Sequence, residues 1–154
     1  MELDKKTYTN QEIQNLTREP NLKECTFLEL RNWAIVCYFL ETGNRLSTSL
    51  NLQLKDVNLQ TEVICIREIE DTSLVLKTIR MSKELKSVLQ KYLQLRKGEA
   101  EDYLFCDSKG NQLTKAALIR AIIGYNRSRG VEKTSIHVFR YTFQRKKLKK
   151  LKLA

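Results

Sequence analysis

Two arginines and a histidine are the residues of this chain best suited to chemistry on a phosphate. Arg45 follows the triplet Thr-Gly-Asn, and His137 and Arg140 lie three residues apart in the stretch TSIHVFRYTF. A guanidinium group pairs bidentately with phosphate oxygens, and an imidazole can donate a hydrogen bond or a proton near neutral pH. Cutting a phosphodiester without a metal adds negative charge to the non-bridging oxygens, and these three side chains could stabilise that charge.

His137 and Arg140 would share one face of a helix, because residues three apart lie side by side on it. Arg45 is distant in sequence and could join them only through the fold. Taken singly, each residue has an ordinary interpretation. An arginine after Thr-Gly is commonly solvated, and a histidine between Ile136 and Val138 is commonly a hydrogen-bonded core residue. The elements around them must decide between these interpretations.

The hydrophobic pattern predicts an α+β fold that is mainly α-helical, with one small antiparallel β-sheet. Residues 27–42 are apolar nearly all round, which indicates a buried central helix that begins with a capping box at Thr26 and ends at Gly43. Alternating β-branched residues on both sides of a polar turn predict a hairpin. We expect helices over residues 10–18, 27–42, 47–54, 82–98, 114–130 and from 136 onward, strands over 62–69 and 74–81, and an outward turn over 56–61.

Two stretches, in this order, resemble the tyrosine recombinase family of phage integrases and Xer-type recombinases. TGNRLSTSLNLQLKDVNL, around Arg45, resembles the family's TG-x-R box, and TSIHVFRYTF resembles its H-x-x-R box. The hairpin and the helix before YLFCDSKGNQLT also come in the family order, and the resemblance runs from about residue 9 to about residue 143. It implies a catalytic-domain fold that cuts and rejoins double-stranded DNA through a phosphotyrosine intermediate. Arg45, His137 and Arg140 would then hold the DNA phosphate.

The hairpin departs from the family pattern. The resemblance implies a lysine near the hairpin turn that protonates the leaving 5′ oxygen, but here the turn reads EIEDTS. Lys77, on the second strand, is the only lysine in the hairpin and the candidate for this role, with Arg67 on the first strand as the other cation. Thr48 stands where many members carry glutamate, and Tyr141 stands where many carry histidine.

The attacking tyrosine of the family would lie beyond the H-x-x-R helix, and this chain instead ends in QRKKLKKLKLA. Tyr141 is adjacent to Arg140, so on a helix its side chain points about 100° away. We therefore expect a C-terminally truncated catalytic domain over residues 1–143, with a Lys-rich tail over 144–154, no nucleophile, and no strand cleavage by this chain alone. All six tyrosines precede the expected position: Tyr8, Tyr38, Tyr92, Tyr103, Tyr125 and Tyr141.

With the later helices absent, part of the core would lie open. We expect Phe139, Phe143 and one face of the helix over residues 27–40 to be more exposed than in a complete family member.

The net charge of +10 favours a polyanionic partner, because neutralising phosphates releases counterions. Most of this excess lies after residue 130, so the tail accounts for much of it. We expect Lys146 and Lys147 to contact DNA. Two alternatives stay open for the tail: a basic amphipathic helix on an anionic membrane surface, or lysine-rich sequence with no selected role.

Several classes of protein are disfavoured by the sequence. It has no long apolar run that could span a membrane, and its polar start argues against a secretory signal, so we expect a cytoplasmic protein with no membrane partner. Neither a metal nor a cofactor is expected, since no cysteines form a CxxC pair with zinc-site spacing. The four thiols are expected to be reduced: Cys25, Cys37, Cys65 and Cys106.

Three functions remain. The first is an integrase domain that binds DNA but is inactive without its nucleophile. The second is a non-catalytic regulator that binds DNA or other recombinase protomers, and the third is an inert remnant of a mobile element.

Overall fold

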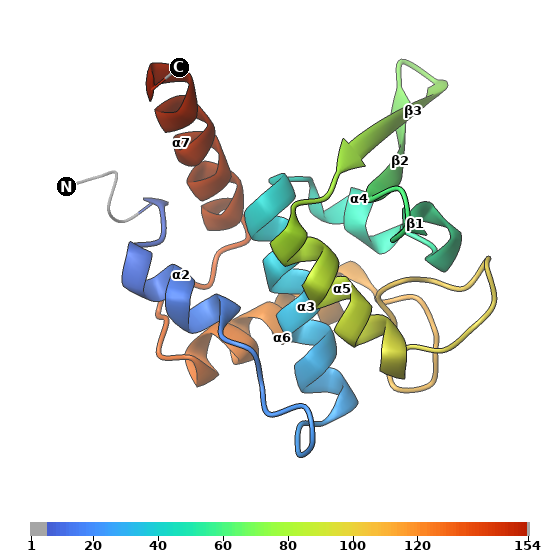
Figure 1. The fold of residues 1–154 in the computed structure, drawn as a ribbon, viewed down its shortest axis with the longest axis horizontal. Helices are drawn as coiled ribbons and strands as arrows, with labels where there is room; N and C mark the ends of the chain where they lie inside the picture. The colour runs from blue at the N-terminus through green and yellow to red at the C-terminus, as the bar shows by residue number, and fades with distance from the viewer. Residues whose placement is uncertain (1–5, 154) are drawn as a thin grey trace. The chain divides into compact units, whose positions relative to one another are not determined.

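A computed structural model describes residues 6–153 of the chain (Figure 1). The first five residues, which belong to the polar start that argued against a secretory signal, and Ala154 lie outside the described residues. The described chain forms two compact units, one with residues 6–44 and 116–153 and the other with Arg45–Lys115. The first unit is helical and the second contains the sheet, which confirms the predicted mainly helical α+β class.

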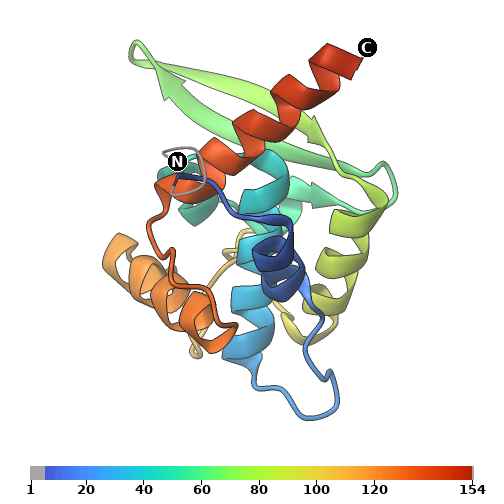
Figure 2. The same ribbon diagram turned by 90° about the vertical axis from the view of Figure 1, so that its left-hand side faces the viewer.

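Helix α3 (Phe27–Thr42) forms the core of the first unit, as its apolar pattern predicted. Thr26 Oγ1 accepts a hydrogen bond from the backbone N–H of Glu29, and Gly43 ends the helix in the left-handed conformation with φ of 61°. All side chains from Trp33 to Leu40 are buried. The other helices of this unit are α2 (Asn10–Thr17), α6 (Lys115–Ser128) and α7 (His137–Leu153), and α2 and α7 pack against α3 (Figure 2).

The contact of α7 with α3 is aromatic. The ring of Phe139 lies 5.7 Å from that of Phe39 and 5.2 Å from that of Tyr8, in tilted and edge-to-face geometry. The prediction that Phe139 is unusually exposed is therefore wrong, because Tyr8 and Phe39 cover it and leave only 1% of it accessible. Phe143 is partly buried against Gly43.

The Lys-rich tail continues α7 without a break up to Leu153. Its first basic residue, Arg145, is partly buried, whereas the residues from Lys146 to Lys152 are exposed. In both ribbon views the C-terminal half of α7 extends beyond α2, α3 and α6 (Figures 1 and 2). The lysines are therefore displayed along one projecting helix.

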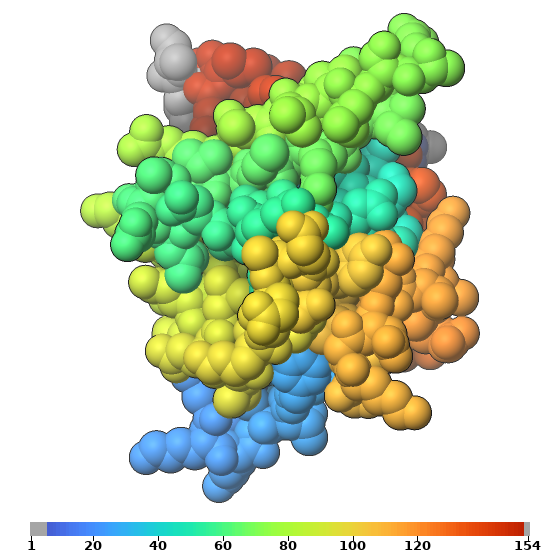
Figure 3. Space-filling view, turned by 90° about the vertical axis from the view of Figure 1, so that its right-hand side faces the viewer, coloured from blue at the N-terminus to red at the C-terminus, as the bar shows by residue number. Residues whose placement is uncertain are grey.

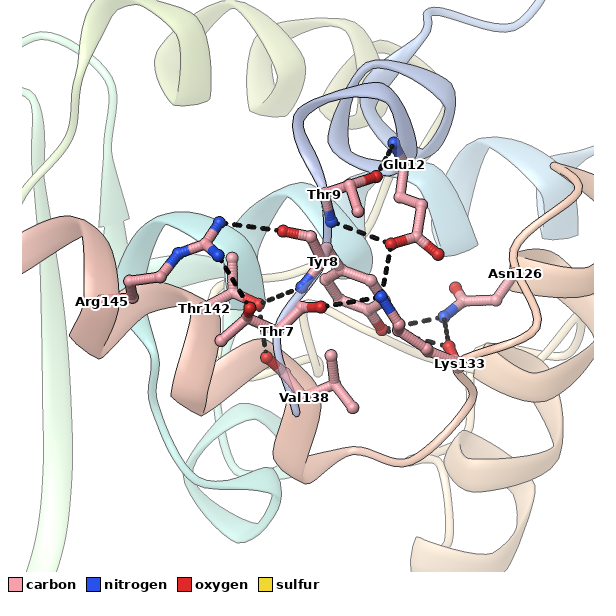
Figure 4. A network of polar contacts seen from close by, with 9 residues as sticks. All are labelled: Thr7, Tyr8, Thr9, Glu12, Asn126, Lys133, Val138, Thr142 and Arg145. Atoms are coloured by element: carbon pink, nitrogen blue, oxygen red, sulfur yellow. Dashed lines mark hydrogen bonds and ion pairs between the residues drawn. The ribbon is translucent and has the colours of Figure 1, made fainter. Parts of the chain in front are cut away.

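Residues 7–9, here called the N-terminal strap, lie across α7 before they lead into α2 (Figure 4). The strap ends at Thr9, which caps α2 through a complete capping box with Glu12. The backbone N–H of Tyr8 donates to Thr142 Oγ1 at 2.9 Å, and Thr142 Oγ1 in turn donates to the carbonyl of Val138 at 2.6 Å. The first and last segments of the unit are thus joined by buried hydrogen bonds.

The second unit contains a three-stranded antiparallel sheet in the order β1 (Val57–Asn58), β2 (Val63–Glu70) and β3 (Ser73–Arg80). The predicted hairpin is confirmed, and its two turn residues, Asp71 and Thr72, both have positive φ, as tight hairpin turns require. Strand β1 lies where we predicted an outward turn. A strand of two residues is too short to show an alternating pattern.

The predicted helix that carries both Leu50 and Leu54 is wrong. Helix α4 (Leu46–Leu50) is followed by a separate 3-10 turn (Leu54–Asp56). Between them the backbone pairs with a distant loop, since the N–H of Leu54 donates to the carbonyl of Asp102 and the carbonyl of Leu52 accepts from the N–H of Leu104. These bonds replace those of a continuing helix.

Helix α5 (Lys83–Leu95) begins at the predicted cap, Ser82, but ends before the predicted stop at Gly98. Arg96 accounts for the early end. Its guanidinium donates to the carbonyl of Tyr103 at 2.9 and 3.1 Å, and this buried side chain fixes the loop that follows the helix.

Replacing Gly43 with alanine should lower the free energy of unfolding by about 1–3 kcal/mol, because a side chain there is strained at positive φ and would also overlap the ring of Phe143. The matched control is Gly124→Ala, on an exposed face of α6 with nothing within 4 Å of the new methyl group. That change should raise the free energy of unfolding by about 0.5–1 kcal/mol. Urea unfolding of both variants tests this, and equal effects would contradict it.

Candidate functional site

His137 and Arg140 lie in the first turn of α7, where the fold brings them to one face of the helix. His137 is the first helical residue and is exposed, and Arg140 is partly buried. Val138 and Phe139, between them, are both buried. The apolar residues therefore anchor this turn while the histidine and the arginine remain accessible.

The tail lysines of α7 divide between two faces. At 100° per residue, Lys147 falls on the same side of the helix as His137 and Arg140. Lys146 falls on the opposite side, and the pKa of its ammonium group is lowered by desolvation and by the nearby charges of Arg145 and Lys150. Of the two tail lysines proposed to contact DNA, only Lys147 extends the face of His137 and Arg140.

Arg45 is the N-cap residue of α4 and is exposed. The left-handed turn at Gly43 separates it from the end of α3. Asn44 is held in this turn, since its side-chain amide donates to Tyr38 Oη at 2.8 Å and its backbone N–H donates to Thr42 Oγ1. Arg45 belongs to the second compact unit, so its convergence with His137 and Arg140 stays a prediction.

Three arginines elsewhere in the chain hold the fold together. Arg67 pairs with Asp56 at 2.6 Å, Arg96 binds the carbonyl of Tyr103, and Arg129 binds two backbone carbonyls near the end of α2. Arg45 and Arg140 differ from these. Within residues 6–153, neither guanidinium has a hydrogen-bond or carboxylate partner, and Arg140 lacks one although it is partly buried.

The hairpin lysine is held by two carboxylates. Lys77 Nζ lies 2.9 Å from Glu70 Oε1 and 3.1 Å from Glu68 Oε2. Hydrogen bonds to Glu70 and Glu68, and the charges of both groups, raise the pKa of this exposed lysine. Lys77 lies opposite Ile66 in the middle of the hairpin and not at its turn, which projects from the second unit (Figure 3).

The pairing of three acidic residues, Asp56, Glu68 and Glu70, with the hairpin cations was not predicted from the sequence. Asp56 is buried and pairs with Arg67, so that neither Lys77 nor Arg67 is free among the described residues. Glu68 binds Lys77, and its Oε1 also lies 3.5 Å from Thr48 Oγ1, at the residue where many family members carry glutamate. The alternation of Glu68 and Glu70 along β2 is the signal that could have placed both on the face of Lys77.

Most tyrosine hydroxyl groups are engaged within the protein. Those of Tyr92 and Tyr125 each donate to a backbone carbonyl at 2.6 Å, and burial raises the pKa of Tyr8 and Tyr125. Tyr38 is fully buried. Tyr141 is the most exposed tyrosine of residues 6–153, and it lies next to Arg140 on α7 but about 100° around the helix.

The described residues offer neither a metal site nor a membrane span. Across residues 6–153, no group of three or more His, Cys, Asp or Glu side chains could hold a metal ion. No helix in that range has both the length and the apolar character that a membrane crossing requires. All four cysteines are free thiols, with Cys37 and Cys106 buried and Cys25 and Cys65 partly buried.

Solved structures of recombinases have a fold similar to that of this chain. The crystal structure of XerA recombinase matches with a TM-score of 0.75 and 25% identity over 94% of this chain and 49% of that chain. XerH site-specific recombinase bound to difH substrate, in a pre-cleavage complex, matches with a TM-score of 0.69, 22% identity, and coverage of 94% and 43%. The Tn1549 transposon integrase in complex with circular intermediate DNA matches with a TM-score of 0.61, 22% identity, and coverage of 90% and 51%.

The phage integrase family matches residues 6–150 of the sequence. The chain belongs to this family, and its fold is that of the tyrosine recombinase catalytic domain. It spans about half the length of the structures above. A comparison with curated protein sequences found no match.

Replacing Glu68 and Glu70 together with glutamine should return the pKa of Lys77 toward its ordinary value, because the hydrogen bonds and charges that raise it would be weakened. An NMR titration of the lysine side-chain carbons measures this pKa directly. The control is Glu101→Gln, which removes the exposed partner of Lys55 and should leave Lys77 unchanged. An unaltered Lys77 titration in the double variant would show that the two carboxylates do not hold this group in solution.

Proposed function

We propose that this chain binds the backbone of double-stranded DNA through Arg45, His137 and Arg140, and that it does not itself cut the strand. The observation that carries the proposal is the partial burial of Arg140 and its lack of a partner among residues 6–153. A partly buried guanidinium with no partner within residues 6–153 is suited to an anion supplied from outside. His137, one helical turn away, adds a donor to the same face.

The family supports DNA as that anion. The matching structures of XerH and of the Tn1549 integrase are complexes with DNA. Lys147 extends the face of His137 and Arg140 along α7, and further exposed lysines follow it. These charges would strengthen binding independently of sequence and would make it sensitive to salt.

The residue proposed to protonate the leaving 5′ oxygen in the family reaction is not free in this chain. Its candidate acid, Lys77, is already paired with Glu68 and Glu70, and Arg67 is paired with Asp56. The buried tyrosines have hydroxyl groups that are hydrogen-bonded to protein or covered, and a nucleophile must be accessible. Binding without strand cleavage is the function that this arrangement favours.

Arg45→Ala and Arg140→Ala should each weaken binding of a fluorescently labelled DNA duplex by about 10- to 100-fold, the usual effect of losing a charged hydrogen-bonded contact. Arg120→Ala is the matched control, since it removes one exposed cation on α6 and should change affinity about twofold or less. Fluorescence anisotropy at two salt concentrations measures all three variants.

The contribution of the tail is tested separately by Lys149→Gln, Lys150→Gln and Lys152→Gln in one variant. Deletion of the tail is less suitable, because Arg145 holds the N-terminal strap. If this variant loses binding while Arg45→Ala and Arg140→Ala bind like the unmodified chain, the phosphate site is not the binding site.

Incubation with a nicked suicide duplex should give no covalent protein–DNA complex on a denaturing gel. A complete family member serves as the positive control. A covalent band would overturn the absence of cleavage, and its loss in Tyr141→Phe would identify the most exposed tyrosine of residues 6–153 as the nucleophile.

A further inference from the structure

The N-terminal strap contacts one side of α7 (Figure 4). The contacts lie at Phe139, Thr142 and Arg145, spaced by three residues along the helix. At 100° per residue, Thr142 points about 160° away from Arg140. The strap therefore holds the back of the helix whose front carries the proposed phosphate ligands.

Thr142 connects the strap to the turn that contains the site. Its Oγ1 accepts the backbone N–H of Tyr8 at 2.9 Å and donates to the carbonyl of Val138 at 2.6 Å. Val138 lies between His137 and Arg140, and Thr142 itself is fully buried. One hydroxyl group thus joins the strap to the first turn of α7.

Two cations bind the strap from its two sides. Arg145 donates to Thr7 Oγ1 at 2.9 Å and to the carbonyl of Tyr8 at 3.0 Å, and Lys133 donates to the carbonyl of Thr7 at 2.9 Å and to Glu12 at 2.8 Å. Lys133 lies just before α7 and Arg145 lies two turns into it. These contacts hold the strap against α7 and against the segment that precedes the helix.

We propose that the N-terminal strap positions His137 and Arg140 for phosphate binding, with Tyr8, Thr142 and Arg145 as positioning residues. If the strap is released, α7 loses the hydrogen bonds that Thr142 and Arg145 make to it and the ring contact of Phe139 with Tyr8, so the helix can rotate and Arg140 loses its alignment with a phosphate. This inference rests on the proposed DNA binding. The N-terminal strap would thereby control how tightly the domain holds DNA.

The test is a double-mutant cycle between Thr142→Val and Arg140→Ala, with affinity for a labelled duplex as the readout. Thr142→Val removes the hydroxyl group at nearly constant volume. It should weaken binding about fivefold when Arg140 is present and leave affinity unchanged when Arg140 is replaced. Thr142→Ser, which keeps the hydroxyl group, should restore the affinity. A merely structural role would weaken both backgrounds equally.

The matched control is Thr17→Val. Thr17 Oγ1 donates to the carbonyl of Ile13 at 2.8 Å, which is the same bond four residues back in a helix of the same unit, but it does not touch the strap. This variant should bind DNA like the unmodified chain. If it weakens binding as much as Thr142→Val, the strap has no special role.

Arg145→Lys is the second variant in case Thr142→Val does not fold. It keeps the charge but cannot make both bonds to the strap. It should also weaken binding only when Arg140 is present. If Arg140→Ala alone leaves DNA affinity unchanged, the proposed function fails. If Arg140→Ala weakens binding, but Thr142→Val and Arg145→Lys weaken it equally with and without Arg140, only the positioning role fails.

Discussion

The packing of α7 against α3 is the interaction on which the candidate site depends. Phe139 lies between Phe39 and Tyr8, and it is flanked in sequence by Val138, also buried, and by Arg140. Burial of one phenylalanine contributes about 1.5–3 kcal/mol, and each aromatic pair adds about 0.5–1.5 kcal/mol. Because the anchor and the site share one helical turn, any rotation that exposes Phe139 also displaces Arg140.

The packing of α7 against α3 also restricts the residue that ends α3. Phe143, one turn after Phe139, lies so close to Gly43 that no side chain fits there. Gly43 also needs its left-handed conformation to end α3 and to lead through Asn44 to Arg45. The helix that carries the H-x-x-R residues therefore contacts the chain two residues before Arg45, so that one glycine satisfies both a conformational and a packing requirement.

Most of the fold could be predicted from local patterns. The position of His137 and Arg140 on the same face of one helix could also be predicted in this way. The period of α3, its capping residues and the alternation in the hairpin depend only on neighbouring residues. The errors arise where distant contacts decide, since Phe139 is buried because Tyr8, which is 131 positions earlier in the chain, covers it. The pairing of Lys77 depends likewise on the register of two strands, and no local pattern links the N-terminal strap to α7.

The distribution of charge is consistent with the proposed function, in which the chain binds DNA without cutting it. Around the hairpin, Glu68 and Glu70 pair with Lys77, and Asp71 adds a further negative charge at the turn. Along α7 the cations have few acidic neighbours, and Arg140 and Lys147 lie on one face. In the proposed function, Arg45, His137 and Arg140 bind a phosphate. Lys77, the candidate to protonate a leaving oxygen, is already paired with Glu68 and Glu70. The net charge of the chain does not reveal this difference, because it sums the charges of the hairpin and of α7.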